Sequence, residues 1–309
     1  MLTLPAFPND PDVRDLTLAL NYRCNSRCRF CFIEPEISGG APDTPLELVE
    51  EVFRRNAESS AFERIIFSGA EATLRPDLPE IVAGARARGG FDYVRIQTNA
   101  RRLKERDYAQ QLFDAGLGEY FVSVHAPRSE LDALVTGASH GFGQMRAGLR
   151  NLLALGARVI SNSAVTQDNY RELPKLARFL LQEGVRESEF WAFIEFGDIG
   201  QAHQHVRHTE ALPYLLEAVT VLREAGSTVR LSWFPECLLG QHADLVANHR
   251  AFTLILDEFK QRMHDNARFS CPHQNTCPRF SRSCVGVHER YLANFGNPDD
   301  GLTPFAAPA

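Results

Sequence analysis

The chain has 309 residues, an ordinary hydrophobic content of 44% and a formal net charge of -6 at pH 7. This length suits one large α/β domain with a small appendage. The acidic balance argues against a protein that binds nucleic acid through a basic surface, without excluding a specific RNA substrate. Residues 1–12 show no secretory signal, and no stretch approaches the ~18 apolar residues of a membrane span. We therefore expect a cytoplasmic protein, in which disulfides are disfavoured.

From residue 16 onwards, short apolar runs alternate with longer helical patterns, which is typical of a parallel sheet wrapped by helices. The predicted strands are Leu16–Leu20, Arg64–Phe67, Tyr93–Gln97, Tyr120–Val124, Arg158–Asn162, Glu189–Ile194 and Val229–Trp233. The predicted helices cover residues 44–56, 77–88, Glu105–Ala115, Phe142–Leu155, Tyr170–Glu183 and Glu210–Ala225. Glycines follow most of these helices, as expected of residues that end a helix.

Two of the helices begin with a pattern typical of capping. Thr44 is expected to cap the first helix, Pro45 suits its first turn, and Glu47 would complete a capping box. Asp77 and Glu80 repeat this arrangement before the second helix. These starts support the order strand, loop, helix in the first part of the chain.

Six or seven strand–helix units are fewer than the eight of a closed (β/α)8 barrel. We therefore predict an α/β fold, a partial (β/α)6 TIM-like barrel, over residues 1–235. Beyond this point one helix is expected between about Leu245 and Met263, followed by a segment rich in Cys, Pro, His and Arg. Such a segment needs a staple such as a metal, so residues 236–309 are predicted to form a small cysteine-rich extension with a loose tail over Asn297–Ala309.

Three cysteines follow the first predicted strand at a spacing of C-x3-C-x2-C: Cys24, Cys28 and Cys31. Thiolates grouped this closely usually hold an iron–sulfur cluster or zinc. A cubane cluster has four irons, so three protein ligands leave one iron free for a small molecule. A purely structural metal site normally closes its coordination sphere, so the spacing favours a working site.

The other four cysteines lie in the last quarter of the chain, at Cys237, Cys271, Cys277 and Cys284. Three plus four cysteines suit one open cluster and one fully ligated cluster. Structural zinc, which also takes four thiolates, is the rival interpretation of the second set.

The first cysteine motif, with the aromatic Phe30 before its last cysteine, resembles that of the radical S-adenosylmethionine (SAM) enzymes. The resemblance implies a [4Fe-4S] cluster on Cys24, Cys28 and Cys31, whose fourth iron binds the amino and carboxylate groups of SAM. It also implies that an electron, supplied by an external flavodoxin- or ferredoxin-type donor, cleaves SAM to methionine and a 5′-deoxyadenosyl radical. This radical would abstract a hydrogen atom from the substrate.

Further segments resemble this family at the ends of successive predicted strands. Gly69-Ala70-Glu71 is similar to its Gly-Gly-Glu motif, with alanine in place of the second glycine, and Thr98-Asn99-Ala100 is similar to its Thr-Asn-Gly motif. Glu71 could accept a hydrogen bond from the SAM ammonium group. The resemblance implies that SAM is contacted by Phe30, Ser68, Gly69, Glu71, Thr98, Asn99, Ser123, Asn162 and Phe193.

The C-terminal cysteines resemble the auxiliary-cluster extensions of radical SAM enzymes of the SPASM or twitch type. We predict a second [4Fe-4S] cluster on all four, with His273 as a possible substitute for one of them. A closed cluster would transfer electrons or support the substrate cavity. In the barrel, His125 is interpreted as a satisfied loop histidine rather than a catalyst. His203, His205 and His208 are interpreted as parts of a flexible polar loop, with a metal site or a substrate clamp as the alternative. Trp191 and Trp233 are interpreted as core residues rather than substrate platforms.

The chain is accordingly predicted to be a radical SAM enzyme that acts on a peptide or a small natural-product precursor. An enzyme of RNA-base modification or cofactor biosynthesis is the alternative, and a structural zinc protein is a more remote one. No catalytic side chain, net reaction or substrate can be named from the residues alone. No membrane partner is expected, and a nucleic-acid partner is disfavoured.

Overall fold

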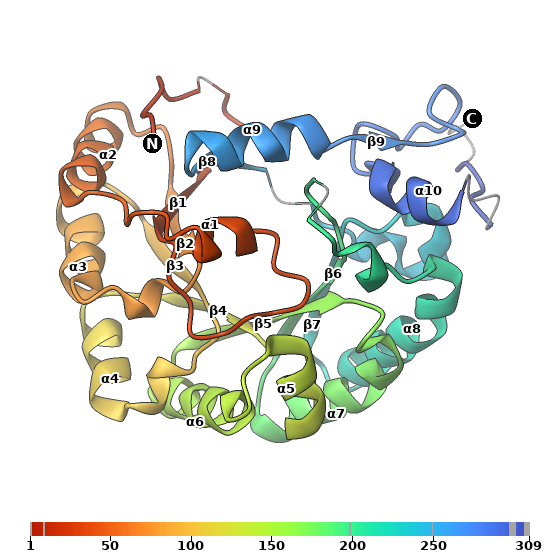
Figure 1. The fold of residues 1–309 in the computed structure, drawn as a ribbon, viewed down its shortest axis with the longest axis horizontal. Helices are drawn as coiled ribbons and strands as arrows, with labels where there is room; N and C mark the ends of the chain where they lie inside the picture. Colours follow the sequence, from red (N-terminus) through yellow and green to blue (C-terminus); the bar gives the residue numbers. More distant parts are fainter. Residues whose placement is uncertain (1, 9, 198, 249, 297–300, 306–309) are drawn as a thin grey trace.

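The computed structural model describes residues 2–8, 10–197, 199–248, 250–296 and 301–305. Within them, eight strands form one sheet in the order β7-β6-β5-β4-β3-β2-β1-β8, and every neighbouring pair is parallel. The sheet curves into a partial barrel (Figure 1). Its strands are β1 Asp15–Asn21, β2 Arg64–Gly69, β3 Tyr93–Thr98, β4 Glu119–Ser123, β5 Arg158–Val165, β6 Glu187–Ala192, β7 Thr228–Ser232 and β8 Ala251–Leu254.

An outer ring of helices surrounds the strands (Figure 1). Its members are α2 Leu46–Ser59, α3 Leu78–Arg88, α4 Arg106–Asp114, α5 Ser129–Thr136, α6 Gly141–Ala154, α7 Leu173–Glu183 and α8 His208–Glu224. The short helix α1, Glu34–Ser38, lies inside this ring, on the near side of the barrel in Figure 1. The fold prediction, an α/β partial TIM-like barrel, is therefore confirmed, although the sheet has eight strands where six or seven were expected.

The residues after the barrel form shorter elements. They are β9 Phe269–Ser270, β10 Val287–His288, α9 Asp257–Asn266 and α10 Glu289–Phe295. Five 3-10 segments complete the description: η1 Ala72–Leu74, η2 Arg102–Lys104, η3 Tyr170–Glu172, η4 Ala202–Gln204 and η5 Glu236–Leu245. In the described part of the chain, no helix combines the length and apolar character needed to cross a bilayer.

The prediction of one helix between Leu245 and Met263 was wrong. This stretch contains the end of η5, then β8, which pairs with β1, and then the beginning of α9. Strand β8 is only four residues long, and Asp257 and Glu258, which begin α9, follow it closely. The chain thus returns to the barrel after residue 235 before it forms the cysteine-rich part.

The predicted capping interactions were also wrong. Pro45 is the N-cap of α2, and the Thr44 hydroxyl instead donates to the Ala19 carbonyl of β1 at 2.6 Å. Asp77 makes no side-chain cap, because its carboxylate accepts from the Arg75 guanidinium at 2.7 Å. A distant strand carbonyl therefore takes the Thr44 hydroxyl, and a neighbouring arginine takes the Asp77 carboxylate, in place of the helix ends.

A buried ion-pair network occupies the amino ends of the strands. The Glu119 carboxylate, with only 4% of its side chain exposed, pairs with Arg95, with Arg158 at 2.7 Å and with Arg64 at 3.4 Å. Asp15 of β1 accepts from Arg64 at 3.0 Å and extends the network across the barrel. Since the amino face of such barrels serves stability, this network is best interpreted as structural.

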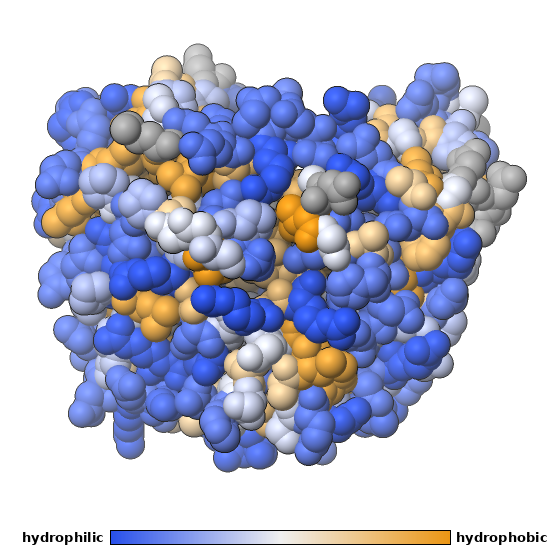
Figure 2. Space-filling view, in the orientation of Figure 1, coloured by the Kyte–Doolittle hydropathy of each residue, from blue (hydrophilic) through white to orange (hydrophobic). Residues whose placement is uncertain are grey.

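The carboxyl half of the strands is more open. Gln97, Ser123, Asn162 and Trp191 are each half-buried, although the strand residues beside them are mostly fully buried. Because side chains alternate between the two faces of a strand, this pattern indicates that solvent reaches the upper interior of the barrel. Figure 2 shows that this side of the molecule is largely hydrophilic and that hydrophobic residues surface in separate patches, several inside the helix ring.

We predict that Glu119→Gln lowers the free energy of unfolding by about 3 kcal/mol, because Arg95 would keep a buried charge without its carboxylate. Urea unfolding of the protein should show this loss. Arg178→Ala is the control, because its pair with Glu217 is half-exposed and worth about 0–1 kcal/mol. Equal stability of the two variants would contradict a structural role for the network.

Candidate active site

The first three cysteines lie on the loop between β1 and α1, at the carboxyl edge of the sheet. Each is half-buried. The Cys24 sulfur accepts from the Ser26 amide at 3.3 Å, and the Cys31 amide donates to the Cys28 carbonyl at 3.1 Å. These contacts turn the loop so that its cysteines stay together.

The surroundings of these thiols disfavour bare thiolates. Burial raises the pKa of Cys24, raises that of Cys28 well above its usual value, and raises that of Cys31 to about 11. For Cys28, the other two sulfurs add to the effect. A metal centre would replace these protons and neutralise the thiolate charges, so the donor set fits a bound cluster.

Neighbouring elements hold the backbone of the cysteine loop. The Arg27 amide donates to the Thr136 carbonyl at the end of α5 at 2.8 Å. Gly137 follows with φ +64°, and a Cβ there would lie 2.6 Å from the Arg27 carbonyl oxygen. On the other side, the Gln201 amide group donates to the Cys31 carbonyl at 2.9 Å. The loop is thus fastened at its middle and at its end.

Glu71 connects the ends of three strands. Its carboxylate is fully buried and accepts from the Thr73 hydroxyl at 2.5 Å, the Thr98 hydroxyl at 2.6 Å and the Asn99 amide at 2.7 Å. Its own carbonyl accepts from the Asn21 side chain at 2.9 Å. Burial raises the pKa of Glu71, and the hydrogen bonds counteract this. Both carboxylate oxygens already have donors from the chain, so a direct contact with the SAM ammonium stays a prediction.

Asn99 carries this connection to the first cysteine. Its side-chain nitrogen donates to Asn25 at 2.7 Å and lies 3.9 Å from the Cys24 sulfur. Ala100 follows with φ 57°, in the left-handed region, where the family motif has glycine. A Cβ at Gly148 would clash with the Ala100 carbonyl, so a glycine on α6 makes room for this turn. Of the predicted strand-end residues, Asn99 therefore contacts the cysteine loop, and Thr98 contacts Glu71.

Gly69 allows the ends of β1 and β2 to approach closely. Its φ is +114°, and a Cβ there would clash with the Asn21 carbonyl. The next amide, of Ala70, donates to that same carbonyl at 2.9 Å. Ser68 is buried beside it at the end of β2. The Ala70 side chain is half-buried in this arrangement, which accommodates the departure from Gly-Gly-Glu.

Phe30 and His125 pack edge to face with ring centroids 4.7 Å apart. The His125 Nδ1 accepts from the Ala164 amide at 3.2 Å, and burial lowers the pKa of His125 to about 4, so the ring is neutral at pH 7. On the paired strands β4 and β5, Ser123 lies opposite Asn162. His125 is thus a satisfied loop histidine, as expected, and it is buried against the cysteine loop.

Two buried side-chain oxygens near this edge lack a partner within the described residues: Asn21 Oδ1 and Asn162 Oδ1. A buried polar atom without a partner is costly, and a ligand that donates a hydrogen bond would remove the cost. Both lie at or near the carboxyl ends of strands, where parallel barrels bind their ligands. The strand ends therefore fit a polar ligand such as SAM.

Beyond β6, Phe193 packs against His205 with ring centroids 4.7 Å apart. The expectation of a flexible polar loop was wrong for two of its three histidines. His203 is exposed, whereas His205 is buried and His208 stacks on Tyr291 at 4.3 Å. The last two therefore join the barrel to α10.

Sequence reasoning missed two residues that hold the cysteine loop. Gln201 lies 170 residues from its partner Cys31. Arg101 donates to the Asn25 carbonyl and, at 3.0 Å, to the Ser26 hydroxyl. Neither belongs to a recognisable motif, so only the folded chain reveals them.

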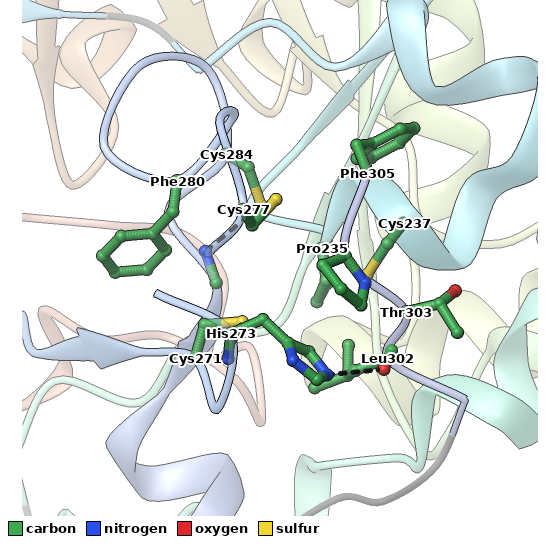
Figure 3. A pocket seen from close by; sticks show the side chains of 12 residues that line it. Pro235, Cys237, Cys271, His273, Cys277, Phe280, Cys284, Leu302, Thr303 and Phe305 are labelled. Atoms are coloured by element: carbon green, nitrogen blue, oxygen red, sulfur yellow. Dashed lines mark hydrogen bonds between the residues drawn. The ribbon is translucent and has the colours of Figure 1, made fainter. Parts of the chain in front are cut away.

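The four C-terminal cysteines line one pocket (Figure 3). Cys237 comes from η5, and the other three come from the segment between α9 and α10. The Cys271 sulfur accepts from the His273 amide and the Cys284 sulfur from the Gly286 amide, both at 3.4 Å. The His273 Nε2 donates to the Leu302 carbonyl at 2.9 Å, so in this arrangement this nitrogen is not available as a metal ligand.

The pocket has only thiols as its soft ligands, which suits an iron–sulfur cluster or zinc. Among the described residues, however, no three His, Cys, Asp or Glu side chains have the spacing for a single metal ion. A cubane cluster binds its thiolates through separate irons and so needs a wider spacing than one ion does. Four thiols are the donor set that either an iron–sulfur cluster or zinc uses.

A parallel partial barrel with three cysteines and a polar ligand seat at its carboxyl edge is the architecture of a cofactor-dependent barrel enzyme. The family model of the radical SAM superfamily matches residues 19–180, which is more than half of the chain. The chain therefore belongs to the radical SAM superfamily, and it is an enzyme of that superfamily. The matched region ends well before the C-terminal cysteines.

Curated relatives are similar to part of the chain. A GTP 3′,8-cyclase from Aquifex aeolicus (strain VF5) is 31% identical over 188 residues, which are 60% of this chain and 57% of that protein. A 7,8-dihydro-6-hydroxymethylpterin dimethyltransferase from Methanocaldococcus jannaschii is 29% identical over 192 residues, 60% of this chain and 34% of that protein. The chain thus matches about half the length of the first relative and a third of the second.

Solved structures share the fold. SuiB of Streptococcus suis, bound to S-adenosylmethionine, superposes with a TM-score of 0.58 at 17% identity, covering 71% of this chain and 50% of that one. The structure of anSMEcpe with bound AdoMet gives 0.59 at 17% identity, covering 70% and 64%. HydG, a maturase of the [FeFe]-hydrogenase, gives 0.57 at 11% identity, covering 78% and 57%. At these identities the likeness is one of fold.

We predict that Glu71→Gln weakens the first cluster site, because a carboxamide would turn an N–H toward one of the donors that the carboxylate now accepts. The expected cost is about 1–3 kcal/mol, with a loss of iron from the site. Thermal melting and iron content measure the two effects. Glu80→Gln is the matched control because Glu80 is exposed. Unchanged melting and iron content in the Glu71 variant would contradict the role assigned to the hydrogen bonds of the Glu71 carboxylate.

Proposed function

We propose that Cys24, Cys28 and Cys31 hold a [4Fe-4S] cluster and that the neighbouring strand ends hold SAM. When bound, this pair supplies the one-electron reductive cleavage of SAM that starts hydrogen abstraction from a substrate. The observation that carries the proposal is a series of hydrogen bonds from Glu71 through Asn99 to the cysteine loop, which we call the Glu71 brace. These hydrogen bonds join the loop of the three thiols to the carboxyl ends of the strands. There, Asn21 Oδ1 and Asn162 Oδ1 have no hydrogen-bond partner within the described residues.

The chain's own residues would bind and orient SAM. Asn162 and Ser123 lie on paired strands at the open end of the barrel, and Asn162 has an acceptor oxygen available for a hydroxyl group. Phe30 and Phe193 would supply apolar contacts from opposite sides of this edge. Neutral His125, already engaged through Nδ1, would keep Phe30 in place without adding charge.

For the substrate, we propose a peptide or a small natural-product precursor that enters the half-open upper barrel. Structures similar in fold include SuiB bound to its precursor peptide SuiA, which supports a peptide. The similarity to GTP 3′,8-cyclases supports cofactor biosynthesis as the second candidate. RNA-base modification has less support, because the chain is acidic.

We further propose that Cys237 of η5 and the three cysteines between α9 and α10, Cys271, Cys277 and Cys284, hold a second [4Fe-4S] cluster. The shared pocket and the two N–H···S contacts support it. With four protein ligands, this cluster would carry electrons or support the substrate cavity. Two oxygen-sensitive centres suit a reducing compartment, which favours a cytoplasmic location.

Reconstituted protein given dithionite and SAM is expected to release 5′-deoxyadenosine, and Cys28→Ser should reduce the yield to background. Cys277→Ser should retain SAM cleavage while iron falls from about eight to about four atoms per chain. Chromatography of the nucleoside and iron analysis measure these outcomes. A colourless protein with about two zinc ions would instead establish the structural zinc alternative. Product analysis with candidate peptides and with GTP would separate the two substrate classes.

An external electron donor would meet the cysteine loop at its exposed arginines. Residues 22–33 contain no acidic residue, and Arg23, Arg27 and Arg29 are exposed. Arg23 pairs with an aspartate at 2.6 Å, and Arg29 pairs with another at 3.0 Å. Arg27 instead donates to carbonyls of its own loop at 2.9 and 3.0 Å, which leaves its positive charge over the cluster site. This surface suits an acidic donor of the flavodoxin or ferredoxin type.

We predict that Arg27→Glu raises the KM for reduced flavodoxin about tenfold at low salt, because the charge change repels an acidic donor. The rate with dithionite should stay unchanged. Arg223→Glu, at the far end of α8 near the amino ends of the strands, is the control. A parallel loss of the dithionite-driven rate would show that Arg27 acts on the cluster site instead of on the donor.

A further inference from the structure

Helix α9 joins the barrel to the cysteine-rich part of the chain. It follows β8, which pairs with β1, and it leads into β9, whose last residue Ser270 directly precedes Cys271. Figure 1 shows α9 along the upper edge of the barrel, between β8 and β9. Of the residues of this helix, all of which the structure describes, Phe259 alone is buried. A helix with so little buried apolar surface depends on specific contacts to keep its place.

Arg262 of α9 contacts the end of the first cysteine loop. Its guanidinium donates to both carboxylate oxygens of Glu36 on α1, at 2.6 and 2.8 Å, and to the Phe32 carbonyl at 2.9 Å. Phe32 directly follows Cys31 in the chain. Only 21% of the Arg262 side chain and 9% of the Glu36 side chain are exposed, so solvent screens this pair less than it screens a surface pair. The planar guanidinium gives the contact a defined geometry.

Aromatic contacts surround Arg262 and add to this junction. The Phe32 ring stacks on Phe259 of α9 with centroids 5.7 Å apart, and Phe196 packs edge to face on Phe32 at 5.6 Å. Gly197 has a φ of +90°, and a Cβ there would lie 3.1 Å from the Arg262 Cδ. The loop after β6 therefore passes directly beside Arg262. The first cysteine loop, α9 and this loop all meet at one arginine.

The other end of α9 is joined to the cysteine-rich part. The Asn266 side chain donates to the Arg262 carbonyl at 2.7 Å and accepts from the Arg290 guanidinium at 3.0 Å. Its backbone carbonyl accepts from the His288 Nε2 at 2.7 Å. His288 belongs to β10, which pairs with β9. A continuous series of contacts therefore runs from this strand pair through α9 to the residue beside Cys31.

The β9–β10 pair forms the base of the segment that carries three of the C-terminal cysteines. Ser270, just before Cys271, pairs with Val287, three residues after Cys284. A Cβ at Gly286 would clash with the Ser270 carbonyl, so the two ends of the segment meet closely. Each strand is only two residues long. Metal bound by the cysteines would therefore add order to this base, since metal binding and folding are coupled in segments with little core.

We propose that Arg262 is a positioning residue that couples the two cysteine sites, so that metal at the C-terminal cysteines strengthens SAM binding at the first cluster. Metal there would order the base of its segment, and α9 would transmit this order through Arg262 to Phe32 and Glu36. SAM is proposed to bind both the cluster and the strand ends, so its affinity depends on how firmly the first cysteine loop is held. This inference rests on both proposed clusters, and it assigns a role to a residue outside the matched family region.

The decisive experiment is a double-mutant cycle of Cys277→Ser and Arg262→Ala, with the Kd for SAM as its readout. The full-length proteins are reconstituted anaerobically, and equilibrium dialysis measures their binding of radiolabelled SAM without a reductant. Iron content is determined on the same samples. Lys260→Ala is the matched control, because it removes an exposed positive charge from the same helix.

Cys277→Ser is expected to raise the Kd about fivefold in the otherwise unchanged chain, and Arg262→Ala should raise it at least as much. The double variant should bind SAM as tightly as Arg262→Ala alone, because α9 no longer transmits the effect. In the Lys260→Ala chain, Cys277→Ser should keep its full effect. A purely structural role for Arg262 would make the two losses add in free energy. Such additivity, or an unchanged Kd in Cys277→Ser, would overturn the coupling.

A second measurement covers the case in which Arg262→Ala loses the first cluster. In a full-length chain with Cys24, Cys28 and Cys31 changed to alanine, hydrogen exchange of the α1 amides is compared with and without iron at the second site. Iron should slow this exchange several-fold when Arg262 is present and leave it unchanged in Arg262→Ala. Equal exchange with and without iron in the chain that keeps Arg262 would overturn the proposal.

The same chain separates this proposal from the first cluster. If it takes up no iron, the second cluster and the coupling both fail. Release of 5′-deoxyadenosine by the unchanged protein still tests the first cluster independently.

Discussion

The buried Glu71 carboxylate is the interaction on which the arrangement of the first cluster site depends. It accepts from donors on η1 and at the end of β3, while its backbone carbonyl binds Asn21 at the end of β1. Asn99 then links the brace to the cysteine loop. A buried carboxylate is costly unless hydrogen bonds satisfy it, so the donors must all be in place for this edge to be stable. The loop is thereby held in one position relative to the strand ends.

The two ends of the barrel differ in how their interior side chains are paired. At the amino ends, Glu119 and its arginines neutralise one another inside the protein. At the carboxyl ends, Gln97, Ser123, Asn162 and Trp191 are half-buried and uncharged, and within the described residues Asn21 Oδ1 and Asn162 Oδ1 lack a hydrogen-bond partner. A closed, charge-balanced end supports the fold, and an open, polar end is where a ligand can bind. The same strands thus serve stability at one end and chemistry at the other.

The cysteine-rich part is built around its sulfurs more than around an apolar core. Its apolar cluster is small, with Val287, Tyr291 and Leu302 as the buried members. Short strands β9 and β10 pair through only two residues each. A segment with so little core requires additional cross-links, and a cluster bound by four cysteines would supply them. Residues 301–305, which line the same pocket, and the metal would then stabilise each other.

Local sequence determined the elements whose signals are short in range. The alternation of apolar runs and helical patterns predicted the partial barrel, because the spacing of apolar residues that marks a strand or a helix involves only residues close in sequence. The motif from Cys24 to Cys31 lies in one loop, and the strand-end positions of Thr98 and Asn99 follow from the strand that precedes them. In contrast, the helix predicted between Leu245 and Met263 failed, because β8 is a strand only through its pairing with β1.

Only the tertiary structure decided which distant groups complete the sites. Gln201 reaches Cys31 across 170 residues, and Arg101 reaches Asn25 across 76. Leu302 and Cys237 meet in one apolar cluster with Tyr291 of α10. Such contacts depend on packing between elements and leave no pattern in the neighbouring residues. The sequence by itself predicted which residues would carry the chemistry, and the fold decided which distant residues lie beside them.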